Sequence, residues 1–269
     1  MSGFVDVHPH VISRDVARYP RAPLGGKQSD WSQERPVSAE EMLRAQEEAG
    51  IEHSVLVQAS TCYGHDNSYV ADAVAAHPKS FSGVFSVDVL AADAPQRITY
   101  WKERGLIGLR VFVAGHTTAQ DVTLDDPRSF PAWECAQGLG LPICVQVRAS
   151  GLGQLEAVLK RFPKARVALD HMARPAHGDL GRICELAKHE NLVLKLTTHN
   201  VHDLPAEFLE RVVMFFGAQR VAWGSNYPAA KGRLADLLAQ ARKALAALTE
   251  EQRDWVFSRT ARDLYLGRN

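Results

Sequence analysis

Short apolar runs rich in β-branched residues alternate along this chain with longer stretches that have helical periodicity. The short runs predict eight strands, at residues 4–11, 51–59, 81–89, 108–113, 142–148, 166–171, 192–198 and 220–226. Each strand is followed by a helical stretch, and eight such strand–helix units can close into a barrel. The pattern therefore predicts a (β/α)8 TIM barrel. An open, doubly wound parallel sheet is the structural alternative.

Three of the helical stretches carry clear start and stop signals, at residues 38–50, 66–78 and 203–217. In the first, Ser38 and Glu41 have the spacing of a capping box, and Gly50 stands at the exit. No Pro- or Ser-rich linker interrupts the alternation, so we expect residues 1–269 to form a single barrel domain. The long irregular segment 12–37 has the length of a loop that covers an active site.

The composition narrows the class of protein. Of 269 residues, 31 are Lys or Arg and 31 are Asp or Glu, and this balance excludes a nucleic-acid or membrane surface as the main partner. The four cysteines form no Cys-x-x-Cys pair, so neither a disulfide framework nor a zinc knuckle is indicated. The N-terminal stretch lacks signal-peptide features, and the apolar run at 212–216 is too short to span a bilayer. We therefore expect a cytoplasmic protein that acts on a small molecule, and its oligomeric state stays open.

Polar residues gather at the carboxyl ends of the predicted strands, where a parallel barrel carries its chemistry. They are His8, His10, Gln58, Ser60, Arg110, His116, Gln146, Arg148, Asp170, His171, Arg174, Lys195, Thr197, His199 and Asn226. Ordinary structural roles exist for several of them: Lys195 can pair with Asp170, and Arg110 can form a core salt bridge. Burying so many polar groups at one end of a barrel is costly without a ligand or a fully paired network, so a binding site is favoured.

The motifs at these positions resemble those of a known family. They are DVHPHV in the first strand, VLVQAS and YGHDN around the end of the second, GLR in the fourth, LDHMARP in the sixth and WGSNYP in the eighth. This set, in this order over almost the whole chain, is similar to the amidohydrolase-related superfamily (amidohydrolase family 2). Within it, the chain resembles the short 2-pyrone-4,6-dicarboxylate lactonase-like hydrolases. The resemblance implies a (β/α)8 barrel that hydrolyses a ring lactone or a related carbonyl bond.

The resemblance also implies roles for individual residues. His8 and His10 would polarise the substrate carbonyl or, together with His171, hold a divalent metal such as zinc. Carboxylate or carbonyl oxygens of the substrate would contact Ser60, Arg110 and Arg174. Arginine suits this task because its rigid fork matches a carboxylate. We expect further substrate contacts from three residues at positions where the family carries other residues. They are His116, Gln146 and His199.

Asn226 is the most consequential departure from the family pattern. The family usually has an aspartate at the end of strand eight, which takes a proton from the attacking water. A neutral amide cannot accept that proton, so we expect Asn226 to orient the water only. The base is then a histidine or a metal-bound hydroxide. Because a carboxylate normally helps to neutralise a bound metal, we expect no metal or one weakly bound zinc ion.

Together these observations predict a hydrolase, metal-dependent or metal-independent, of a small cyclic and carboxylated compound such as a lactone from aromatic or sugar catabolism. Two alternatives stay open. One is a non-oxidative decarboxylase of the same superfamily, which would release carbon dioxide rather than open a ring. The other is a catalytically weakened member that binds its ligand without turnover, because Asn226 replaces the usual aspartate.

Overall fold

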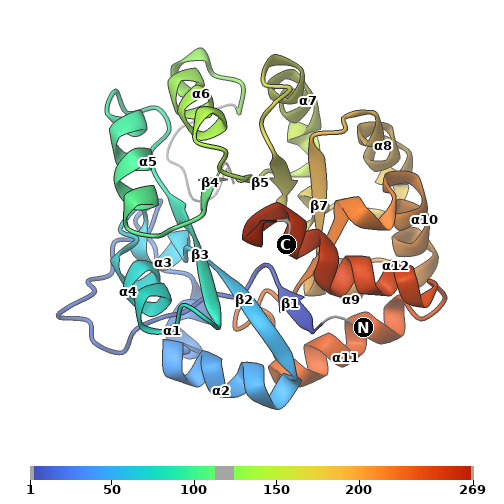
Figure 1. Cartoon of the computed structure of the whole chain (residues 1–269), viewed down its shortest axis with the longest axis horizontal. Helices are drawn as coiled ribbons and strands as arrows, with labels where there is room; N and C mark the ends of the chain where they lie inside the picture. Colours follow the sequence, from blue (N-terminus) through green and yellow to red (C-terminus); the bar gives the residue numbers. More distant parts are fainter. Residues whose placement is uncertain (1–2, 113–123, 268–269) are drawn as a thin grey trace.

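Eight parallel strands form the centre of the molecule, each hydrogen-bonded to the next in sequence order (Figure 1). The computed structural model describes residues 3–112 and 124–267. The strands are β1 (Phe4–Asp6), β2 (Ile51–Val57), β3 (Phe81–Ser86), β4 (Gly108–Phe112), β5 (Ile143–Gln146), β6 (Val167–Leu169), β7 (Leu192–Thr197) and β8 (Val221–Gly224). First and last strand meet where the N–H of Val7 donates to the carbonyl of Trp223 at 3.2 Å. The predicted (β/α)8 barrel is confirmed.

Helices surround the barrel and alternate with the strands (Figure 1). They are α1 (Asp30–Glu34), α2 (Ala39–Ala49), α3 (Ser60–Tyr63), α4 (Ser68–Ala76), α5 (Ala94–Glu103), α6 (Phe130–Gly138), α7 (Leu152–Arg161), α8 (Leu180–Glu185), α9 (Thr198–Asp203), α10 (Ala206–Phe216), α11 (Leu234–Ala244) and α12 (Glu250–Asp254). The helix predicted at 38–50 is confirmed as α2, where Ser38 accepts from the N–H of Glu41 and Gly50 ends the helix at φ +67°. None of the helices in the described part of the chain is long and apolar enough to cross a membrane.

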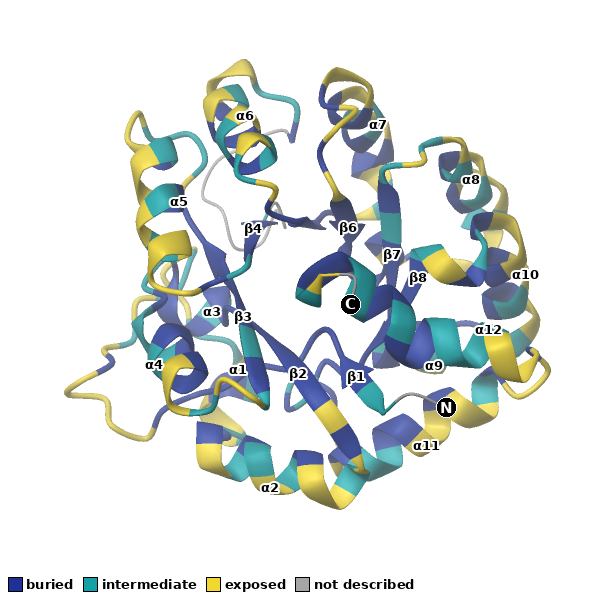
Figure 2. Cartoon of the chain, viewed as in Figure 1, coloured by how far each residue is buried: buried dark blue, intermediate teal, exposed yellow. Residues whose placement is uncertain are grey.

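Apolar side chains pack in two layers, one outside the barrel and one inside it. The outer layer joins strand residues such as Leu56 and Ile143 to helix residues such as Leu155. Small side chains fill the interior, including Val5, Val55, Val84, Cys144, Ala168 and Ala222. Beyond α12 the chain forms two π-helical turns, and Tyr265 of the second packs on this inner cluster. The second of these turns therefore lies over the ring of strands (Figure 1), and most residues of the strands are buried (Figure 2).

Several strands end earlier than the sequence predicts. The strand predicted at 4–11 ends at Asp6, and the strand predicted at 166–171 ends at Leu169. Beyond these points the backbone pairs with loops instead of a neighbouring strand, as when the N–H of His10 donates to the carbonyl of Tyr227 at 2.8 Å. Residues predicted to alternate along strands therefore lie on loops, and loop conformation sets the direction of their side chains.

Candidate active site

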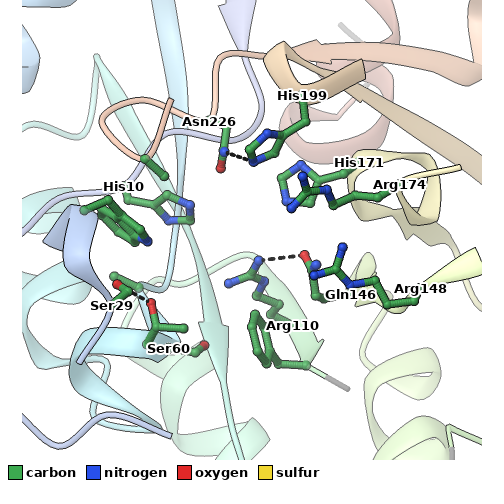
Figure 3. A pocket seen from close by; sticks show the side chains of 15 residues that line it. His10, Ser29, Ser60, Arg110, Gln146, Arg148, His171, Arg174, His199 and Asn226 are labelled. Carbon is green, nitrogen blue, oxygen red and sulfur yellow. Dashed lines mark hydrogen bonds between the residues drawn. The ribbon is translucent and has the colours of Figure 1, made fainter. Parts of the chain in front are cut away.

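A cavity of about 300 Å³ opens at the carboxyl ends of the strands, and this volume suits a small molecule (Figure 3). The predicted site residues that line it are His10, Ser60, Arg110, Gln146, His171, Arg174, His199 and Asn226. His8 is not among the lining residues, because it is fully buried and its ring contacts the rings of His10 and His171. His116 lies outside the described residues. The barrel thus gathers in one place residues that are far apart in the sequence.

Some lining residues were not predicted as site residues. Ser29 and Trp31 come from the long segment 12–37, and the ring of Trp31 packs on that of His10 at a centroid distance of 5.3 Å. This contact agrees with the covering role expected for the segment. Arg148 also lines the cavity. It was among the polar residues found at the strand ends, two residues beyond Gln146, but the family resemblance implied no role for it.

The end of β1 is fastened to the end of β8 by a buried carboxylate. Asp6 Oδ1 accepts from the backbone N–H of His8 at 3.0 Å and from that of Ser225 at 2.8 Å. These two segments of the backbone come so close that a Cβ at Gly224 would lie 2.6 Å from the Cβ of His8, so only glycine fits there. His10 follows, and its Nδ1 lies 2.7 Å from the carbonyl oxygen of Val57. These contacts leave Nε2 as the free nitrogen of His10.

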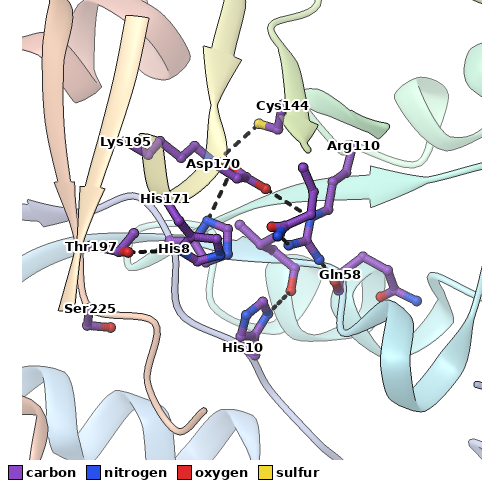
Figure 4. Close-up of polar contacts among 12 residues, drawn as sticks. His8, His10, Gln58, Arg110, Cys144, Asp170, His171, Lys195, Thr197 and Ser225 are labelled. Atoms are coloured by element: carbon purple, nitrogen blue, oxygen red, sulfur yellow. Dashed lines mark hydrogen bonds and ion pairs between the residues drawn. The ribbon is translucent and has the colours of Figure 1, made fainter. Parts of the chain in front are cut away.

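A cluster of buried charges lies beneath the cavity (Figure 4). Asp170 pairs with Lys195 Nζ at 3.1 Å and with Arg110 Nε at 3.1 Å, so the ion pairs anticipated as structural roles are present. Burial alone would raise the pKa of Asp170, but the charge of Lys195 and its other neighbours holds it well below the usual value. Burial disfavours the charged form of Lys195 and would lower its pKa, but the charge of Asp170 outweighs burial, so the pKa of Lys195 is raised. Asp170 and Lys195 are therefore both ionised at neutral pH.

Arg110 is bound by the protein through every nitrogen of its guanidinium. Besides the pair with Asp170, Nη1 donates to the carbonyl of Gln58 at 3.1 Å and Nη2 donates to Oε1 of Gln146 at 3.2 Å. Its charge faces the cavity, and these contacts use three of its five N–H donors. Arg148 and Arg174 are the exposed arginines of the lining, and Arg174 has only a loose pair with Asp203 at 3.7 Å.

The electrostatics of the cavity favour an anion. No Asp or Glu is found among its described lining residues, whereas three arginines line it. Burial lowers the pKa of Arg148, and the neighbouring charge of Arg174 lowers it further. Two like charges held close together in this way are stabilised by a ligand of opposite charge, and an arginine fork binds a carboxylate through two parallel hydrogen bonds.

The histidines around the cavity are neutral at pH 7. Burial lowers the pKa of His8 to about 4 and, reinforced by the charge of Arg174, lowers that of His199 to about 4. Burial and the neighbouring His8 hold the pKa values of His10 and His171 well below the ordinary value of 6.5. A neutral imidazole has one nitrogen that accepts a proton and one that donates. In His10 the donor is Nδ1, which faces the carbonyl of Val57, so its free Nε2 can act as a base.

His171 lies on a left-handed turn, and not on a strand as predicted. The four residues from His171 to Arg174 have φ values of +55°, +50°, +61° and +50°. None is glycine, and a left-handed conformation costs roughly 1–2 kcal/mol for each residue that has a Cβ. Contacts from β7 and α9 hold the turn, including a 2.8 Å bond between Nδ1 of His171 and Oγ1 of Thr197.

Asn226 also has a left-handed backbone, at φ +56°, which asparagine tolerates better than most residues. Its Nδ2 lies 2.9 Å from Nε2 of His199, so the amide donates to the imidazole. Figure 3 shows the amide between His199 and the side of the cavity that carries His10. The position suits a group that orients a small molecule such as water in the cavity.

The predicted zinc ligands meet part of what a metal needs. Nδ1 of His10 and of His171 is hydrogen-bonded to the protein, which leaves Nε2 of each ring free, the arrangement usual for metal-binding histidines. Within residues 3–112 and 124–267, however, no three His, Cys, Asp or Glu side chains converge as a metal-ligand set. The described residues therefore do not fit a complete metal site, and zinc binding stays a prediction.

Comparison with known proteins adds independent information. The family model described as amidohydrolase matches residues 5–266. The L-fucono-1,5-lactonase of Burkholderia ambifaria is 29% identical in an alignment of length 246 that covers 84% of this chain and 81% of that protein. A probable 2-pyrone-4,6-dicarboxylic acid hydrolase from Acinetobacter baumannii, solved with citric acid bound, has a TM-score of 0.79 and 16% identity, covering 97% of this chain and 98% of its own. An amidohydrolase from Burkholderia multivorans with bound zinc has a TM-score of 0.78 and 20% identity, covering 98% of this chain and 99% of its own.

Proposed function

This chain belongs to the amidohydrolase family, and from that premise we propose that it opens the ring of a small carboxylated lactone by hydrolysis. It is an enzyme of the hydrolase class. The observation that carries the substrate class is the lining of the cavity, in which three arginines and three neutral histidines occur with no acidic side chain among the described residues. Such a lining suits a substrate that is an anion and a reaction that generates a further negative charge.

The proposed reaction divides the cavity into two parts. The exposed Arg148 and Arg174 bind the carboxylate of the substrate, and the ester carbonyl lies toward His10 and His171. Asn226 orients a water molecule, whose oxygen attacks the carbonyl carbon. The charge that develops on the carbonyl oxygen is stabilised by the remaining N–H donors and the fixed positive charge of Arg110, which lines the cavity.

Proton transfer falls to an imidazole in this proposal. A neutral histidine of the lining accepts the proton of the attacking water, and the ring C–O bond then breaks. The same imidazolium returns the proton to the alkoxide that leaves, so that the product is a hydroxy acid. The lowered pKa values keep the imidazoles neutral before the reaction. A base whose pKa is about 4 is no weaker than the aspartate that the family usually places at this end of the barrel.

A panel of lactones tests the proposal. Sugar-acid lactones and pyrone carboxylates are mixed with the purified protein, and ring opening is followed by proton release with and without added zinc. We expect turnover of at least one carboxylated lactone, and His171→Gln should lower kcat/KM by about 100-fold or more. The control is His53→Gln, because His53 is also buried but bonds Ser82 and Lys79 at the opposite end of the strands.

Each alternative has its own outcome in this assay. Release of carbon dioxide from a carboxylated ring, without ring opening, would identify a decarboxylase. Ligand binding without any turnover would identify a weakened, ligand-binding member of the family. Equal losses in His171→Gln and His53→Gln would show that the histidines at the mouth are structural.

A further inference from the structure

The turn that carries His171 and Arg174 is held by hydrogen bonds to the backbone carbonyl of His171. Asn200, in α9, donates through Nδ2 to the carbonyl oxygen of His171 at 2.8 Å. The same carbonyl also accepts from the N–H of Arg174 at 2.8 Å. Asn200 is 2% exposed, so bulk water has almost no access to this contact.

The amide of Asn200 also binds the strand that supports the ring of His171. Its Oδ1 accepts from the N–H of Thr197 at 2.9 Å, and lies 3.3 Å from Oγ1 of Thr197. That hydroxyl is the group bonded to Nδ1 of His171 (Figure 4). One buried amide thus connects the backbone of His171, through its carbonyl, with the hydroxyl that orients its side chain.

The conformation of this turn needs such support. His171, Met172, Ala173 and Arg174 are all left-handed, and each carries a Cβ that disfavours this region. In this conformation the side chains of His171 and Arg174 both line the cavity. If the turn left the left-handed region, both side chains would point elsewhere.

We propose that Asn200 is a positioning residue, which locks the left-handed turn so that His171 and Arg174 reach the cavity together. The inference rests on the proposed lactone hydrolysis for its kinetic consequences, but not for its structural one. Asn200 touches no substrate and acts only through the two residues that it positions. Its effect therefore falls on kcat through His171 and on KM through Arg174.

The alternative is that Asn200 merely caps α9, since its side chain accepts from the backbone of the N-cap residue Thr197. Asn200→Asp separates the two roles. The carboxylate keeps the acceptor for Thr197, but it has no N–H for the carbonyl of His171. A helix cap would survive this change, and the lock on the turn would not.

Asn67 offers a matched control on another part of the barrel. It is fully buried, accepts from the N–H of Ser86 at 2.8 Å, and donates to the carbonyls of His65 and Ser86 at 3.0 and 2.9 Å. Asn67→Asp therefore imposes the same chemical change, a buried carboxylate that keeps an acceptor and loses donors. None of these three residues is among the described residues that line the cavity.

Kinetics on the preferred lactone form the first test, at a temperature well below the Tm of every variant. Asn200→Asp should lower kcat/KM by about tenfold or more, with a lower kcat and a higher KM, because small misplacements of reacting groups are costly. Asn67→Asp should leave both constants nearly unchanged. Adding Ala173→Gly should restore part of the loss, since glycine adopts the left-handed region freely. Equal losses in the two aspartate variants, or no rescue by glycine, would overturn the proposal.

A crystal structure of Asn200→Asp is the second test and needs no activity. We expect residues 171–174 to leave the left-handed region, or His171 and Arg174 to withdraw from the cavity. If all four residues keep positive φ and both side chains still line the cavity, the proposal is wrong whatever the kinetics show. If the unaltered protein opens no lactone at all, the proposed function fails, and the structure of the variant still decides the role of Asn200.

Discussion

Replacing Asn226 with aspartate should create or increase lactonase activity. The change is nearly isosteric, and aspartate, like asparagine, tolerates the φ of +56° found at this position. The new carboxylate would lie in the cavity lining at the carboxyl end of β8, where the family usually places its base. It could take the proton of the attacking water directly, which the amide cannot do.

The expected gain follows from general-base catalysis, which typically contributes about 10²–10⁴-fold, or about 3–5 kcal/mol of transition-state stabilisation. Part of this is offset, because a carboxylate in place of a residue that is 4% exposed loses its hydration. The surrounding arginines and His199, whose Nε2 lies 2.9 Å from the Asn226 amide, compensate for that cost. We therefore expect a net increase of about tenfold or more in kcat on the better lactones.

The assay is initial-rate ring opening across the lactone panel, with Asn226→Ala as the control. The alanine variant removes the amide without supplying a base, so its rate should fall below that of the unaltered protein. Metal content is measured in parallel after dialysis against a chelator. We expect little zinc in the unaltered protein and more in Asn226→Asp, since a carboxylate strengthens a cluster of neutral imidazoles. Stoichiometric zinc in the unaltered protein would contradict this expectation.

Unchanged or lower turnover of a folded Asn226→Asp variant would refute the reasoning. Asparagine would then be the correct residue for this chemistry. In that case the hydrogen bond from Asn226 to His199 would define the tautomer of a catalytic imidazole, and the aspartate would disrupt it.

Three other predictions concern charge. Arg174→Met should raise KM by about tenfold or more for a carboxylated lactone and much less for its neutral ester, because charge-assisted hydrogen bonds contribute about 1.5–3 kcal/mol; equal losses would mean that the arginine is structural. Lys195→Met should lower the free energy of unfolding in urea by about 3–5 kcal/mol, because it removes one of the two buried cations that pair with the carboxylate of Asp170. A loss below about 1 kcal/mol would contradict that. The hydrogen bond from Lys188, followed by that from His189, lowers the pKa of Glu156 from 4.5 to about 2. The stability that the ionised Glu156 contributes is therefore present above pH 4.5 and is lost as the pH falls toward 2. Glu156→Gln should therefore be less stable by up to about 1 kcal/mol at pH 6, with a difference that disappears in acid denaturation curves below about pH 2.

The sequence alone determined the architecture and the identity of most groups at the mouth. The alternation of strands and helices and the capping box of Ser38 and Glu41 follow from local sequence patterns. Each of these patterns depends only on neighbours a few residues away. The rule that chemistry lies at the carboxyl ends of parallel strands then selected residues such as His10 and Asn226. These predictions needed no knowledge of how distant segments meet.

Only the tertiary structure decided how those groups are used. It placed His8 below the cavity, left Arg148 and Arg174 exposed, and bound every nitrogen of Arg110 to the protein. Whether a polar side chain is free or paired depends on residues brought together when the barrel closes, and periodicity along the chain carries no information about that.

The turn at 171–174 shows the same limit most clearly. Read alone, LDHMARP continues a strand, because none of its left-handed residues is a glycine that would signal positive φ. The conformation is stabilised by a hydroxyl from Thr197, at the end of the next strand, and by an amide from Asn200, in the helix that follows that strand. A local preference was overridden by buried contacts made at long range, and those contacts exist only once the barrel is formed.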